Sequence, residues 1–117
     1  MITATFADDG EKLSLTVDGH AGYAPHGQDL ICSAVTAFVY TAAVIADEMA
    51  HSGLTERKPI IHMDSGKASI FLHPRSGCMR EARMKMGVIQ TGIELLADNY
   101  PGNVRVNIIG YGNKPIK

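Results

Sequence analysis

Residues 29–53 of the 117-residue chain read DLICSAVTAFVYTAAVIADEMAHSG, and they predict one long core helix. Asp29 is a good N-cap residue, because its carboxylate can accept a hydrogen bond from an N–H group of the first helical turn. Gly53 suits the C-terminal stop. The predicted apolar stripe, at spacings of three and four residues, consists of Ile31, Val35, Phe38, Ala42, Ile45 and Met49. Alanines on the other faces let this helix pack on more than one side.

The uncharged run over residues 30–46 raises the alternative of a membrane span. The run includes Ser33, Thr36, Tyr40 and Thr41 and is short for a bilayer, so a buried core helix is favoured. The chain opens MITATF, without the basic and apolar regions of a secretory signal. We therefore expect a cytoplasmic protein with no membrane partner.

Alternating apolar and polar residues predict strands before and after this helix. Residues 2–6 and 13–17 flank the turn signal Asp8-Asp9-Gly10, and they predict a first hairpin. Residues 59–63 and 68–73 flank a second turn and predict a second hairpin. Residues 104–108 predict the final strand, and we expect residues 110–117 to be frayed.

A second amphipathic helix is predicted between Pro74 and Pro101, with Ser76 as its N-cap. Its apolar stripe is Ala82, Met86, Ile89, Ile93, Leu96 and Tyr100. The element order is then ββαββαβ. It predicts a single α+β domain over residues 1–117, with two amphipathic helices packed on a largely antiparallel five-stranded sheet.

Charge and cysteine content exclude several classes of protein. The formal net charge is −1, which argues against direct binding of nucleic acid. Cys32 and Cys78 do not make a disulfide framework, and two free thiols fit a reducing cytoplasm.

Chemistry concentrates in residues 19–32, GHAGYAPHGQDLIC. With Asp29 as the N-cap, Cys32 lies in the first helical turn, where free N–H groups and the helix dipole favour a thiolate. A nearby carboxylate opposes that effect, although Asp29 could also orient a histidine. The alternative is that Cys32 is a small buried hydrophobic residue. That alternative is stronger for Cys78, which stands beside Met79 at a predicted helix start and has poorer surroundings for a reactive thiol.

Two histidines compete as the base for a Cys32 nucleophile. His20 ends the second predicted strand, and it can approach the helix start if the intervening loop folds back. His26 is closer in sequence but lies on that loop, which carries Gly22, Pro25 and Gly27 and is expected to be mobile. The same two histidines and Cys32 could instead bind zinc. The absence of a CxxC or HxxxH pair and of an evident fourth ligand disfavours zinc, and we expect neither metal nor cofactor.

At these residues the sequence resembles the ribosomal-processing cysteine protease Prp family. The matching positions are Gly19-His20-Ala21, Tyr23-Ala24, Gly27, Asp29 and Ile31-Cys32-Ser33-Ala34-Val35. The order of strands and helices fits the family over nearly the full chain. Two mild departures are Ser33, where alanine is common, and Thr36, where serine is frequent.

The resemblance implies a cysteine endopeptidase with Cys32 as nucleophile, His20 as general base and Asp29 as a supporting residue. Gly19, Ala21, Gly22, Tyr23 and Gly27 would form the substrate loop. Such enzymes remove a short N-terminal extension from a large-subunit ribosomal protein, and related ones process phage structural proteins with a similar sequence. The resemblance further implies a metal-free homodimer.

The competing hypothesis is a non-catalytic peptide-binding module, associated with ribosome or phage capsid assembly on the same scaffold. It predicts peptide binding without turnover and no selective alkylation of Cys32 over Cys78.

Overall fold

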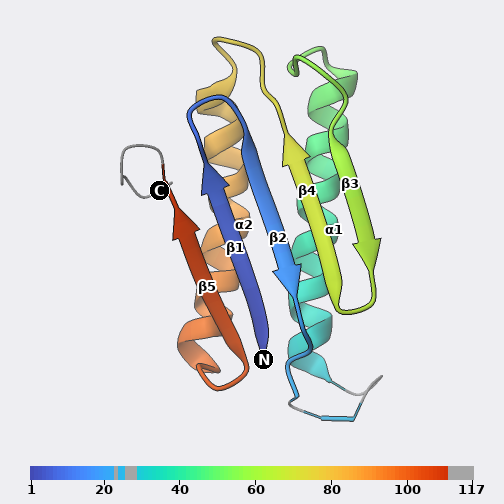
Figure 1. The fold of residues 1–117 in the computed structure, drawn as a ribbon, viewed down its shortest axis with the longest axis vertical. Helices are drawn as coiled ribbons and strands as arrows, with labels where there is room; N and C mark the ends of the chain where they lie inside the picture. Colours follow the sequence, from blue (N-terminus) through green and yellow to red (C-terminus); the bar gives the residue numbers. More distant parts are fainter. Residues whose placement is uncertain (23, 26–28, 111–117) are drawn as a thin grey trace.

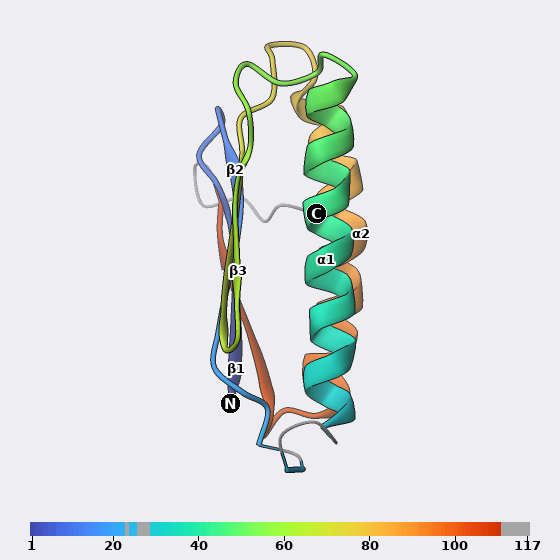
Figure 2. The ribbon, with the colours of Figure 1, turned by 90° about the vertical axis from the view of Figure 1, so that its right-hand side faces the viewer.

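Two antiparallel helices cover one face of a five-stranded sheet (Figures 1 and 2). The computed structural model describes residues 1–22, 24, 25 and 29–110. The elements are β1 Ile2–Asp8, β2 Leu13–Asp18, α1 Leu30–His51, β3 Ile60–Asp64, β4 Lys67–Leu72, α2 Met79–Asn99 and β5 Val104–Ile109. The predicted order ββαββαβ and the α+β class are confirmed. The expected fraying of the tail falls mostly on residues 111–117, which lie outside the described residues.

The strands lie in the order β3-β4-β2-β1-β5. Both predicted hairpins form: β1 pairs antiparallel with β2, and β3 with β4. Strand β4 also pairs antiparallel with β2, which places Lys67 opposite Asp18. Among the strand pairings of the described residues, only that of β1 with β5 is parallel, so the sheet is largely antiparallel as predicted. The pairing of β2 with β4 carries the tip of the second hairpin to the end of β2.

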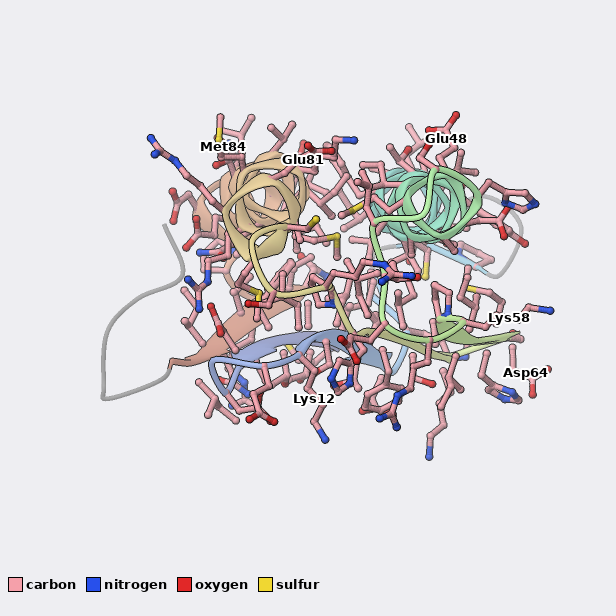
Figure 3. All side chains as sticks on the ribbon, turned by 90° about the horizontal axis from the view of Figure 1, so that it is seen from above. Lys12, Glu48, Lys58, Asp64, Glu81 and Met84 are labelled. Carbon is pink, nitrogen blue, oxygen red and sulfur yellow. The ribbon has the colours of Figure 1, made fainter. Side chains whose placement is uncertain are left out.

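The core lies between the sheet and the helices, because alternate strand residues point to the helical face. Figure 3 shows this end-on, with Glu48, Glu81 and Met84 pointing away from the sheet. The buried residues of α1 are Ile31, Val35, Val39, Ala42, Ala46 and Met49. Phe38 and Ile45 of the predicted stripe are only partly buried. Phe38 instead faces α2, where a Cβ on Gly92 would collide with its ring.

Both predicted ends of α1 are confirmed. Asp29 is the N-cap and accepts a hydrogen bond from Cys32 N–H at 2.9 Å. Gly53 has φ +75°, and the N–H groups of Gly53 and Leu54 donate to the carbonyls of Ala50 and Met49. These two hydrogen bonds and the positive φ of Gly53 form the common C-terminal capping motif of helices that end at a glycine. By length and composition alone α1 could cross a membrane, but core helices meet the same test, and α1 buries six residues in the core.

The predicted N-cap of α2 is wrong. The helix begins at Met79, and its N-cap is Cys78, which makes no side-chain capping bond. Cys78 N–H donates to the Arg75 carbonyl at 2.9 Å, so a backbone turn precedes the helix and leaves Ser76 outside it. The stripe of α2 is otherwise confirmed for Ala82, Met86, Ile89 and Ile93, whereas Leu96 and Tyr100 are partly buried.

An ion pair that the sequence did not reveal ties α2 to the sheet. Arg83 Nε donates to Asp8 Oδ2 at 2.7 Å, and Asp8 is only 6 % exposed. The hydrogen bond from Arg83 to Asp8 raises the pKa of the guanidinium, because it favours the charged form. Asp8 also accepts from Gly10 N–H, as its predicted place in the turn requires. The first turns of α2 are therefore held by a charge pair instead of by a cap.

Candidate active site

Three segments that are distant in sequence meet at one end of the molecule. They are the end of β2, the turn between β3 and β4, and the start of α1, all at the lower end of Figure 1. A cavity of about 910 Å³ lies among them. His20 and Cys32, the two residues predicted as base and nucleophile, both line this cavity.

Cys32 is positioned by the N-terminal cap of α1. It is partly buried and packs against the core, while its backbone N–H donates to Asp29 Oδ1. The second carboxylate oxygen of Asp29 accepts from Ala24 N–H at 3.4 Å, which ties the preceding loop to the same cap. Asp29 is 6 % exposed and lines the cavity. The supporting residue predicted from the sequence thus fixes the helix start that carries Cys32.

Gly19 links β2 to His20, and any other residue at position 19 would force the neighbouring backbone to move. Gly19 has φ +99°, and a Cβ there would collide with the Met1 carbonyl. Gly19 N–H donates to the Gly66 carbonyl at 2.8 Å, and the His20 carbonyl accepts from the Met1 amino group at 2.6 Å. The backbone on both sides of the His20 side chain is therefore held by neighbouring segments.

Of the other residues predicted for the substrate loop, one lines the cavity, one lies in the core and two lie outside the described residues. Gly22, with φ +67°, lines the cavity. Ala21 is 2 % exposed and belongs to the core, and its carbonyl accepts from Asn103 Nδ2 at 2.8 Å. Tyr23, Gly27 and the rival base His26 lie outside the described residues, so their predicted roles and the mobility of the loop stay predictions.

Sequence reasoning missed the wall that the second hairpin contributes to the cavity. The lining includes Met63 and all four residues of the hairpin tip, Asp64, Ser65, Gly66 and Lys67. The local sequence predicted a turn at these positions. These residues lie near the His20 segment because β4 pairs with β2. The local sequence pattern does not predict that strand order.

The zinc alternative from the sequence includes His26, which lies outside the described residues, so the structure does not test that site as a whole. Within residues 1–22, 24, 25 and 29–110, no three His, Cys, Asp or Glu side chains gather as a metal site would need. Cys78 is the N-cap of α2, which starts at the opposite end of the molecule from the start of α1 (Figure 1). Cys78 does not line the cavity. Neither cysteine forms a disulfide.

The model of the family "Cysteine protease Prp" matches residues 1–105. The chain belongs to the Prp cysteine protease family. The ribosomal processing cysteine protease Prp of Bacillus subtilis (strain 168) is 34 % identical over 93 % of this chain and 100 % of its own length. The corresponding protein of Staphylococcus aureus (strain Mu50) is 25 % identical over 92 % of this chain and 98 % of its own length.

Solved Prp structures share the fold. A crystal structure of the essential ribosomal processing protease Prp from S. aureus with a covalently linked product peptide matches with a TM-score of 0.66 and 23 % identity. It covers 92 % of this chain and 99 % of that one. The same protease with a substrate peptide matches with a TM-score of 0.61 and 22 % identity, over 92 % and 99 % of the two chains. As a Prp family member the chain is a cysteine protease, as predicted from the resemblance.

Proposed function

We propose that this protease removes a short N-terminal extension from a large-subunit ribosomal protein, with Cys32 as nucleophile and His20 as general base. One observation carries the assignment: these two side chains, from α1 and from the end of β2, line the same cavity. The named activity of the relatives, ribosomal processing, supports the substrate class.

The reaction proceeds through an acyl-enzyme. The His20 imidazole takes the thiol proton, and the Cys32 thiolate attacks the scissile carbonyl to form a tetrahedral intermediate. The C–N bond then breaks, the departing amine takes the proton from the imidazolium, and a thioester remains on Cys32. Water, deprotonated by His20, hydrolyses the thioester and releases the new carboxyl end.

Asp29 supports this chemistry by fixing the geometry of the first helical turn. The dipole of a helix acts only within its first turn, and Cys32 lies in the first turn of α1. Because the Cys32 N–H already donates to Asp29, the oxyanion of the tetrahedral intermediate would draw on other N–H groups. Gly19 and Gly22 present backbone without side chains to the cavity, which suits close approach of a peptide.

Mass spectrometry tests the proposal directly. The host's large-subunit ribosomal proteins, with their full N-termini, are incubated with the enzyme and with its Cys32→Ala form. We expect one of them to lose a short N-terminal segment only with the native enzyme. Cleavage of a phage structural protein alone would overturn the ribosomal substrate, and cleavage by Cys32→Ala would overturn the nucleophile.

Two further features belong to the proposal. We expect the enzyme to act in the cytoplasm, where its ribosomal substrate is made, and to be a homodimer. Light scattering at micromolar concentration checks the second expectation, and a monomer at that concentration contradicts it.

A further inference from the structure

The tip of the second hairpin lies directly against the imidazole of His20. Gly66 has φ +75°, and a Cβ built on it would lie 2.7 Å from His20 Nε2. The same Cβ would lie 3.2 Å from Cε1 and 3.4 Å from Cδ2. The far edge of the ring therefore occupies the space that any side chain at residue 66 would need.

Backbone hydrogen bonds join the segment before His20 to the hairpin tip. Gly19, the residue before His20, donates its N–H to the Gly66 carbonyl at 2.8 Å. The pairing of β2 with β4 continues to Asp18 and Lys67, the residues next to this bond. The segment that carries His20 and the hairpin tip are therefore joined by backbone hydrogen bonds, and both line the cavity that Cys32 also lines.

We propose that Gly66 is a positioning residue for His20. Because Gly66 has no side chain, the His20 imidazole can occupy the space beside it. This inference rests on the proposed role of His20 as the general base. A Cβ at residue 66 would push the ring, which is the end of a flexible side chain, more readily than it would move the sheet. A displaced ring would no longer hold the position in which it lines the cavity that Cys32 also lines.

The chain offers a matched control for the backbone strain of such a substitution. Gly53 also has φ +75°, but a Cβ there would have no atom within 4 Å. Gly53→Ala therefore carries the unfavourable φ without the contact to His20. Gly66→Ala carries both, so the difference between the two variants isolates the displacement of the imidazole.

The test compares kcat, KM and the thermal unfolding midpoint of both variants on a peptide with the cleavage sequence. We expect Gly53→Ala and Gly66→Ala to lower the unfolding midpoint to a similar degree. Gly66→Ala should lower kcat at least about tenfold with KM nearly unchanged, since proton transfer contributes about 100-fold or more to such reactions. Gly53→Ala should keep kcat within about twofold, because it touches neither substrate nor His20.

A double variant separates positioning from a general structural effect. In a His20→Ala background, Gly66→Ala should cause no further loss of the residual activity, because the ring that it displaces is gone. If Gly66→Ala does not fold, Gly66→Asn replaces it, since asparagine tolerates positive φ yet carries the same Cβ. Equal kcat for the Gly66 and Gly53 variants, or equal losses with and without His20, would overturn the positioning role.

The proposed function fails by a different result. Full activity of His20→Ala would refute His20 as the base, whatever Gly66→Ala does. The contact itself can be followed without catalysis, through the NMR signals of the His20 imidazole. We expect those signals to shift in Gly66→Ala and to stay in place in Gly53→Ala, and no shift in either variant would refute the contact.

Discussion

Cys32 and Cys78 stand at the starts of two antiparallel helices, at opposite ends of the molecule (Figure 1). Both are partly buried and free of disulfides. Cys32 lies inside the first turn of a helix capped by Asp29, beside a cavity that His20 shares. Cys78 is itself the N-cap of α2, with no side-chain capping bond and no place in that cavity.

The comparison shows that two cysteines at helix starts can have very different surroundings. A helix dipole and partial exposure are present at both ends. What differs is the surrounding structure: the end of β2 and the second hairpin converge on Cys32, whereas the start of α2 is anchored to β1 by Arg83 and Asp8. The start of α1 brings a thiol to a cavity, and the start of α2 is joined to the sheet by an ion pair.

The largest contrast is expected in catalysis. Cys32→Ala should lower kcat/KM for the cleavage peptide by at least about 1,000-fold, because the nucleophile and its base act as a unit. Cys78→Ala should keep kcat/KM within about twofold, since it lies outside the site. The rates are measured by liquid chromatography of the peptide products. Comparable losses of kcat/KM in the two variants would contradict the proposed difference between the two cysteines.

The anchoring role of the other end predicts the largest effect on stability. Arg83→Ala leaves the buried Asp8 carboxylate without its charged partner, and we expect the free energy of unfolding to fall by about 1–3 kcal/mol. Urea unfolding measures this, with the exposed Arg80→Ala on the same helix as the control. The folded Arg83→Ala enzyme should keep its kcat, and a selective loss of kcat would contradict the division between the two ends.

The two predicted N-caps should differ in the same assay. Asp29→Ala removes an observed capping bond and should lower the free energy of unfolding by about 1 kcal/mol. Ser76 makes no cap, so Ser76→Ala should change that free energy by less than about 0.5 kcal/mol. Asp29→Ala should also slow the reaction of Cys32, because the helix start loosens. Equal stability effects would mean that the cap at Asp29 does not hold the site.

Local chemistry explains how much of this fold could be read from the sequence. The alternation of Leu13 and Leu15 with polar residues, and the cap at Asp29, act over a few residues and were predicted correctly. Ser76 was misassigned because a backbone turn, invisible in composition, comes before α2. The predicted α1 stripe placed Phe38 in the core, whereas the closeness of α2 draws it toward Gly92.

The long-range parts of the site could not be predicted. Asp8 and Arg83 are 75 positions apart, and Asp8 had a sufficient local explanation as a turn residue. The contact of Gly66 with His20 follows from β4 lying between β3 and β2, which is a property of the whole sheet. The family motif selected His20 and Cys32, but it gave no indication of the hairpin that lies against His20.

The most direct measurement is the rate of alkylation of each cysteine by iodoacetamide at neutral pH, followed by mass spectrometry of the peptides. The two thiols fall in the same class of partial burial, so burial alone would give similar rates. We predict that Cys32 reacts at least about tenfold faster than Cys78, and that His20→Ala removes most of this difference. Equal rates for the two cysteines in the native enzyme, unaffected by His20→Ala, would contradict the assignment of Cys32 and His20 as a catalytic pair.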